Sequence, residues 1–161
     1  MSTKKKDFAS IADVHRIYMR ADAHSITERI NKETGLEQDV RWIEAFLLQA
    51  TLLEGVLVNL GLKLLESRKD LAGLKGKRHT KYGFDNAIND LYLMKAIKTE
   101  EFNLLEKYKS KRNEYIHNLL SKNTEDIENE VLNIYNQYKD FVWKMIKQLE
   151  KLEKKKIKSK K

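Results

Sequence analysis

The sequence predicts an all-α fold, an up-and-down bundle of four to five helices, and three observations support this prediction. The chain of 161 residues contains no proline and only six glycines, so it holds few residues that break a helix. Apolar residues recur at steps of three and four over long stretches, which is the period of an amphipathic helix. No stretch shows the strict alternation of apolar and polar residues that is typical of a half-buried strand.

The N-terminal part of the chain has the weakest helical pattern. Residues 1–9 begin with a Lys cluster and carry no long apolar run, so we expect a disordered basic segment and no secretory signal. Residues 10–31 place apolar side chains at loosely helical spacing. They predict the first helix, with Thr34-Gly35 as its stop.

The strongest helical pattern covers residues 38–69. Gly55 and Gly61 each disfavour a helix interior by about 1 kcal/mol, and we interpret them as points of close packing and not as breaks. The apolar positions that define the pattern are Val40, Ile43, Phe46, Leu47, Ala50, Leu53, Leu57, Leu60 and Leu64.

The centre of this helix, residues 45–65, is long enough to span a bilayer. Its apolar run is interrupted by Gln49, Glu54, Asn59 and Lys63. A charge at the centre of a bilayer costs about 2.5–3.5 kcal/mol even on a lenient insertion scale. We therefore expect an amphipathic helix of a cytoplasmic protein, and no membrane as a partner.

A loop and a short helix follow the long helix. The loop covers residues 71–83 and contains three of the six glycines. The short helix is expected over residues 84–97. The loop also carries a basic cluster, which consists of Lys75, Lys77, Arg78, His79 and Lys81.

Two further helices complete the predicted domain, over residues 99–121 and 125–155. Thr99 is the expected N-cap of the first, and Asn123-Thr124 is the expected N-cap of the second. Acidic residues follow both caps within the first turn, where the helix macrodipole favours them.

The net charge of +8 is concentrated at the two ends of the chain. Residues 1–6 carry three Lys and no acid, and residues 147–161 carry eight Lys and two Glu. The remaining residues, 7–146, hold 21 basic and 22 acidic side chains. We expect a single helical domain over residues 10–153 and a disordered Lys-rich tail over residues 154–161. Solvated ends account for both tails, with attraction to polyanions as the alternative.

Few residue types in this sequence are suited to catalysis. The absence of Cys excludes a thiol nucleophile and a disulfide framework. The sequence has no Gly-rich phosphate loop and no pair of His in metal-binding spacing, so we expect neither a metal nor a cofactor. His is the only side chain whose unperturbed pKa lies near neutrality. The four His are His15, His24, His79 and His117.

His117 differs from the other three because of its neighbours. At about 100° per residue, Asn113 and His117 lie about 40° apart on one helical face, with Lys109 one turn before Asn113. Arg112 lies on the adjacent flank, and its guanidinium can bind a phosphate through two hydrogen bonds. An imidazole that moves protons and a guanidinium that stabilises phosphoryl oxygens can cleave a phosphodiester without a metal. The alternative is that these residues form an ordinary solvated surface.

The motif Arg112-Asn-x-x-x-His117 resembles the signature of the HEPN (higher eukaryotes and prokaryotes nucleotide-binding) domain family. In that signature an Arg is followed, after four to six residues, by a His. The order of the preceding segments is also similar: a short helix ending in Leu91-Tyr-Leu-Met-Lys-Ala-Ile97, an acidic turn at Thr99-Glu-Glu, and then the motif helix. A long apolar helix with Glu54 in its middle lies upstream, and the similarity covers roughly residues 39–151.

The resemblance implies an HEPN-like bundle that forms a homodimer. Two motifs, one per subunit, would face each other in a composite, metal-independent endoribonuclease site of a toxin–antitoxin or antiviral defence system. His117 would act as general base or acid, Arg112 would stabilise the phosphate, and Asn113 would orient one of them or the substrate. RNA would be the substrate because its 2′-hydroxyl is the internal nucleophile, and Lys109 and Lys111 would bind it. An antitoxin or other neutralising protein would be a further partner.

A non-catalytic, HEPN-like dimerisation or interaction module is the alternative function. The apolar stripes carry lone aromatic residues, Trp42 and Trp143, and are more extensive than two helices need. Such stripes are typical of a core or of a dimer face. For such a module, a charge placed at Leu57 or Phe141 is expected to abolish partner binding.

Overall fold

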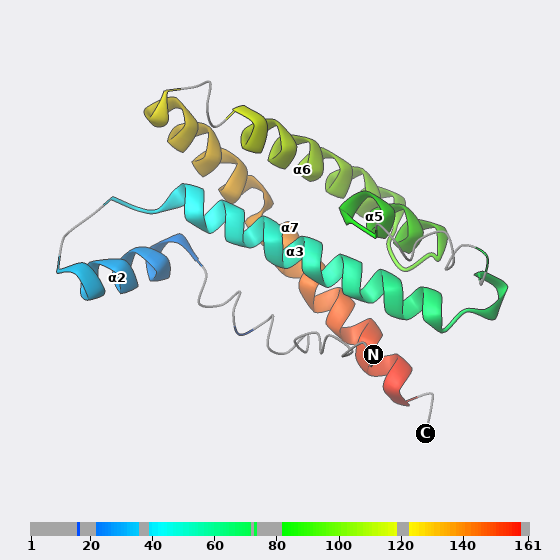
Figure 1. Ribbon diagram of the computed structural model, residues 1–161. Coiled ribbons are helices and arrows are strands. Elements are labelled where there is room, and N and C mark those ends of the chain that lie inside the picture. The colour runs from blue at the N-terminus through cyan, green and yellow to red at the C-terminus, as the bar shows by residue number, and fades with distance from the viewer. Residues whose placement is uncertain are drawn as a thin grey trace, which may run out of the picture.

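The computed structural model is a bundle of α-helices, and the part of the chain that it describes contains no strand (Figure 1). It describes residues 16, 22–35, 39–71, 73, 82–118 and 123–158. The elements are α2 (Ala23–Thr34), α3 (Trp42–Glu66), the 3₁₀ turn η1 (Lys69–Leu71), α5 (Phe84–Leu93), α6 (Thr99–Asn118) and α7 (Thr124–Lys158). The predicted all-α helical bundle is confirmed.

The helix α3 lies at the centre of the bundle and packs against α2, α5 and α7. Its core side chains include Leu53 and Leu57, which are fully buried. Both long helices, α3 and α7, run in the same general direction, whereas α6 runs in the opposite direction to both (Figure 1). The fully buried residues on the other helices include Ile88, Leu91, Leu105, Tyr108, Val142, Met145, Ile146 and Leu149.

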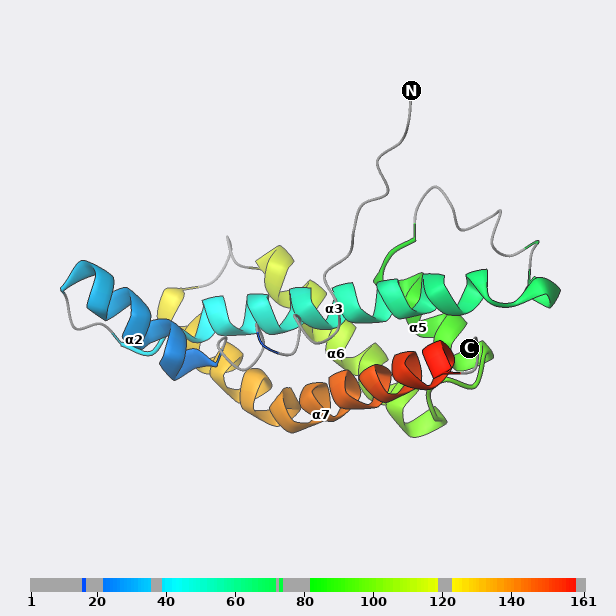
Figure 2. The ribbon, with the colours of Figure 1, turned by 90° about the horizontal axis from the view of Figure 1, so that it is seen from below.

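The helices α5, α6 and α7 follow one another in alternating directions. Tyr92 near the end of α5 stacks on Phe102 near the start of α6, with ring centroids 4.6 Å apart. Tyr115 near the end of α6 donates a hydrogen bond of 2.6 Å to Glu130 in the first part of α7. The C-terminal part of α7 and the turn between α5 and α6 therefore lie at the same end of the molecule (Figure 2).

By length and composition alone, α3 could cross a membrane. In the bundle, 56% of its most apolar 18-residue stretch is buried. This burial is as expected for a core helix, and the packing of α3 against three other helices shows that it is one. One face nevertheless points away from the neighbouring helices. This outer face of α3 comprises Leu52, Gly55 and Leu62, of which the leucines are half-buried and the glycine is exposed.

The two glycines of α3 lie inside an uninterrupted helix, as predicted. A Cβ atom at Gly61 would lie 2.2 Å from the hydroxyl oxygen of Tyr82, so the Tyr82 ring needs the space that glycine leaves. At Gly55 no atom lies within 4 Å of the corresponding position. The predicted close packing is therefore confirmed at Gly61. For Gly55 the same prediction is wrong within a single copy of the chain.

Asp22 interrupts the helix predicted over residues 10–31. Its backbone is extended, with φ −68° and ψ 155°, and its carboxylate accepts hydrogen bonds from the backbone N–H groups of His24 and Ser25. It is therefore the N-cap of α2. The helix ends at the predicted stop, where Gly35 has a φ of 68°. The rest of the predicted helix, apart from one residue, and the N-terminal segment lie outside the described residues.

The helix α5 ends at Leu93, earlier than the predicted end at residue 97. Lys95 follows with a φ of 55°, in the left-handed region. The N–H of Lys95 donates to the carbonyl oxygen of Tyr92, and the N–H of Ala96 donates to that of Leu91. These two bonds form a Schellman turn. Sequence reasoning misses this stop because a lysine occupies the position where glycine is usual.

The starts of α6 and α7 depend on side-chain caps. Thr99 is the first residue of α6 and not its N-cap, and Glu101 accepts a hydrogen bond of 2.9 Å from the N–H of Lys98. This contact is half of a capping box. Asn123 caps α7 as predicted, because its side chain accepts a bond from a backbone N–H in the first turn. The helix α7 continues into residues 154–161, the tail that the sequence predicts to be disordered.

Candidate functional site

The residues of the predicted motif lie in the C-terminal half of α6. Tyr108 and Tyr115 are buried and define the inner face of this helix. The motif residues therefore fall on its flanks and outer face. Arg112 and Asn113 are partly buried, and His117 is exposed.

Arg112 is held at two points. Its Nη2 donates to Oε2 of Glu54 on α3 at 2.9 Å, and its Nη1 donates to Oδ1 of Asn113 at 3.1 Å. These contacts use two of the five N–H groups of a guanidinium. Because 26% of the Arg112 side chain is exposed, the group is both oriented and accessible to an anion.

The direction of the two helices explains why Glu54 meets Arg112. Side chains on a helix lean toward its N-terminus. Since α3 and α6 run in opposite directions (Figure 1), the side chains of Glu54 and Arg112 lean in opposite directions along the bundle and meet between the two helices. The pair is also partly exposed, with 31% of the Glu54 side chain accessible. We therefore treat it as a positioning contact and not as a major source of stability.

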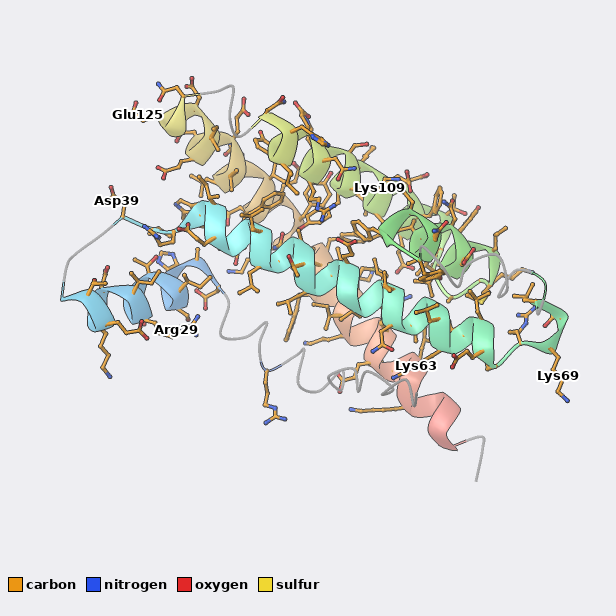
Figure 3. All side chains as sticks on the ribbon, in the orientation of Figure 1. Arg29, Asp39, Lys63, Lys69, Lys109 and Glu125 are labelled. Carbon is orange, nitrogen blue, oxygen red and sulfur yellow. The ribbon has the colours of Figure 1, made fainter. Side chains whose placement is uncertain are left out.

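Of the two lysines predicted to bind RNA, Lys109 is engaged in the fold. It lies on α6 beside α5 (Figure 3), where its Nζ contacts Asp85 and lies 2.8 Å from Oε2 of Glu106. Burial lowers the pKa of Lys109, but the bonds to Asp85 and Glu106 outweigh burial and raise this pKa above its ordinary value. Its charge is thus balanced by two carboxylates. Lys111 is the more accessible of the two, with 51% of its side chain exposed beside Glu114.

His117 does not lie next to the Arg112 guanidinium in one copy of the chain. At about 100° per residue, the two side chains start about 140° apart around α6. Arg112 is turned toward Glu54, whereas the imidazole of His117 forms no hydrogen bond or ion pair with any residue that the structure describes. A single copy therefore brings Arg112, Asn113 and Glu54 together and leaves the imidazole on an outer face.

Sequence reasoning missed two polar contacts that hold α6, one of them buried and the other partly buried. The hydroxyl of Tyr108 donates to Oε1 of Gln49 at 2.9 Å, and both residues are almost completely buried. The hydroxyl of Tyr115 donates to Glu130, and burial together with this carboxylate raises the pKa of Tyr115 above its ordinary value. The signal for the first contact is in the sequence, since Gln49 falls in phase with the apolar stripe of its helix.

No group of three or more His, Asp or Glu side chains that could hold a metal ion occurs in the described part of the chain. The basic cluster predicted in the loop, at residues 75–81, lies outside that part, so its contribution to the site stays a prediction. Compared with known proteins, the chain matches no family model, no curated protein and no solved structure.

Proposed function

We propose that this chain is a metal-independent endoribonuclease of the HEPN type, with a site that two copies complete. The observation that carries the proposal is the guanidinium of Arg112, which Glu54 and Asn113 orient while 26% of the side chain stays exposed. The exposed imidazole of His117 lies about one and a half turns after Arg112 on the same helix. A role as a toxin or antiviral effector in the cytoplasm, neutralised by an antitoxin, belongs to the same proposal.

The reaction is a transfer of the phosphoryl group within the RNA strand. The 2′-oxygen attacks the neighbouring phosphorus, so that a bond from phosphorus to the 2′-oxygen forms and the bond to the 5′-oxygen breaks. The imidazole of His117 accepts the proton of the 2′-hydroxyl, and an imidazolium donates a proton to the leaving 5′-oxygen. Arg112 stabilises the charge on the non-bridging oxygens. The products carry a 2′,3′-cyclic phosphate and a 5′-hydroxyl.

The position of His117 supports a site shared by two copies. Because His117 and Arg112 start about 140° apart around α6, one phosphate is not easily reached by both from the same helix. Two copies that meet along this helix would place the imidazole of one beside the guanidinium of the other. This arrangement also supplies two imidazoles, one for each proton transfer.

The test is cleavage of single-stranded RNA by the purified full chain in the presence of EDTA. We expect cleavage by the wild type, loss of cleavage in His117→Ala and Arg112→Ala, and full cleavage by the control His24→Ala. The control removes an exposed imidazole from α2, and circular dichroism verifies that every variant is folded. Equal cleavage by the wild type and His117→Ala, or equal cleavage of a DNA strand of the same sequence, would show that the proposed site is wrong.

The outer face of α3 favours a second candidate, a non-catalytic dimerisation or interaction module. Half-buried leucines and the open position at Gly55 form a surface on which a second helix can pack closely. A charge at Leu57 does not test this candidate, because Leu57 is fully buried and belongs to the core. Leu62→Glu is the appropriate variant. Loss of self-association in Leu62→Glu, measured by sedimentation, together with no RNA cleavage by the wild type, would favour the module over the enzyme.

A further inference from the structure

We propose that the turn between α5 and α6 binds one unpaired nucleotide of single-stranded RNA, with the base on Tyr92 and the phosphates on Lys95 and Lys98. These three residues and Leu93 form what we name the α5–α6 platform. The inference rests on the proposed function, because it takes RNA as the substrate. It adds a second RNA contact, apart from the motif on α6.

An exposed aromatic ring provides the base-binding part of the platform. The Tyr92 ring stacks on Phe102 with an interplanar angle of 29°, and its hydroxyl lies 3.2 Å from that of Thr99. These contacts fix the ring while 37% of Tyr92 and 69% of Leu93 stay exposed. A fixed and accessible aromatic ring is suited to stacking with a nucleobase, because every base offers a π-face.

The turn forms an open pocket beside this ring. Its lining consists of Tyr92, Leu93, Lys95, Ile97, Lys98 and Thr99. Apolar residues, two residues with hydroxyl groups and two lysines thus line one pocket. This combination suits a ligand with a flat apolar part and an anionic part, as a nucleotide has.

The backbone at Lys95 indicates that its side chain has a use. A residue at this position of a Schellman turn has a left-handed conformation, which glycine adopts without strain. The chain has lysine here, with a φ of 55°. Strain at a non-glycine residue is retained where function requires the side chain, and a lysine that lines the same pocket as Tyr92 is such a case.

The charge at this end of the bundle favours a polyanion. Neither Lys95 nor Lys98 belongs to an ion pair with any other described residue. The nearby carboxylate of Glu101 is buried and already accepts bonds from the N–H of Lys98 and from Gln148, with Lys144 of α7 at 3.9 Å. Lys144 itself is 69% exposed. Three exposed lysines, Lys95, Lys98 and Lys144, therefore lie at this end of the bundle. The exposed carboxylate next to them in the sequence is that of Glu100.

The platform and the motif lie along the same side of α6. Phe102, which supports Tyr92, and Asn113 are about 20° apart around the helix and about 16 Å apart along it. Between them runs the exposed edge of α5, which carries the neutral amide of Asn89. Asp85 on this edge is paired with Lys109, which also contacts Glu106, so the ammonium group offsets part of the negative charge beside a strand that passes here. An RNA strand can therefore contact the platform while another of its phosphates lies at Arg112.

The test is binding of a fluorescent 2′-O-methyl RNA single strand to the full chain, measured by anisotropy over a range of salt concentrations. The 2′-O-methyl groups prevent cleavage, so binding is read alone. Tyr92→Ala is expected to raise Kd about fivefold or more. Lys95→Gly is expected to raise Kd and to lower the slope of log Kd against log salt by about 0.7. The control Lys32→Gln, on α2 at the far end of the molecule, is expected to bind as the wild type does (Figure 1).

Lys95→Gly separates binding from folding. Glycine relieves the strain at this position, so the variant is expected to be at least as stable as the wild type while it binds RNA more weakly. A weaker complex therefore cannot be attributed to unfolding. As a further comparison, binding of a blunt RNA duplex is expected to be insensitive to Tyr92→Ala, because its bases are already stacked.

Three results would overturn the inference. The first is an equal Kd for the wild type, Tyr92→Ala and Lys95→Gly, and the second is no binding by the wild type. The third is an unchanged Kd for Tyr92→Ala together with weaker binding of Lys95→Gly to both RNA and heparin. The last result would indicate a polyanion patch without base stacking. Cleavage that depends on His117, together with unchanged binding by the platform variants, would refute the platform and leave the enzyme. Platform-dependent binding without cleavage would refute the enzyme and leave the platform.

Discussion

Two glycines in the same helix offer a matched test of the packing around α3. Gly55→Ala replaces an exposed glycine in the middle of the helix, where no atom lies within 4 Å of the added Cβ. The change therefore removes only the unfavourable helix propensity of glycine. We expect it to raise the free energy of unfolding by about 0.8–1.0 kcal/mol, which corresponds to a Tm increase of about 2–4 °C for a chain of this size.

Gly61→Ala has the same gain in helix propensity but a steric cost. The new Cβ would lie 2.2 Å from the hydroxyl oxygen of Tyr82 and 3.1 Å from its Cζ. Displacing a ring from a packed position costs typically about 1–3 kcal/mol. After the propensity gain of about 1 kcal/mol is subtracted, the variant should range from unchanged to about 2 kcal/mol less stable. Gly61→Ala is thus expected to be about 1–3 kcal/mol less stable than Gly55→Ala.

Urea unfolding followed by circular dichroism measures this difference. Adding Tyr82→Phe to Gly61→Ala removes the atom that would lie closest to the Cβ, so part of the lost stability should return. The reasoning is refuted if Gly61→Ala stabilises the fold as much as Gly55→Ala does. If Gly55→Ala instead destabilises the chain in a manner that depends on protein concentration, a second copy covers the outer face of α3.

Two further predictions concern a cap and a buried hydrogen bond. Asp22→Ala should lower the free energy of unfolding by about 1 kcal/mol at neutral pH. Burial raises the pKa of Asp22, but its hydrogen bonds outweigh burial and hold this pKa below 3.8 in the folded state. The difference from the wild type should therefore be complete well above pH 3.8 and shrink as the pH falls below it, in urea unfolding curves at several pH values. Tyr108→Phe should cost about 1–3 kcal/mol, because Gln49 loses its buried donor, and Gln49→Met in the same chain should recover part of the loss. An unchanged unfolding curve for Tyr108→Phe would contradict the buried bond.

The helices were predictable because each has an apolar face that only packing in a bundle can bury. The periodic patterns place α3, α6 and α7 within a few residues of their observed bounds. The ends were less predictable, because they depend on single hydrogen bonds. A carboxylate cap at Asp22 divides the first predicted helix, and a left-handed lysine at residue 95 ends α5 early. Neither device changes the apolar pattern on which the prediction depends.

The candidate site was predictable only within one helix. Helical spacing is enough to place Arg112, Asn113 and His117 relative to one another. The contact between Arg112 and Glu54 joins residues 58 positions apart, and no local pattern reports such a pairing. The engagement of Lys109 with α5 has the same origin, since its partner Asp85 lies 24 positions away. Long-range contacts thus decide which of the charged residues on α6 are accessible.

Three neighbouring helices hold α6 through carboxylates: Glu54 on α3, Asp85 on α5 and Glu130 on α7. Each of them engages a side chain of the helix that carries the motif, so the donors of that helix are oriented before any ligand arrives. Preorganised donors stabilise developing charge without the cost of reorganising during the reaction. Arg112 is held by one of these carboxylates and Asn113 is bonded to Arg112, whereas the imidazole of His117 forms no hydrogen bond with any described residue. In the proposed dimer a second copy would orient it, so we expect self-association and catalysis to fail together when the contact between the two copies is disrupted.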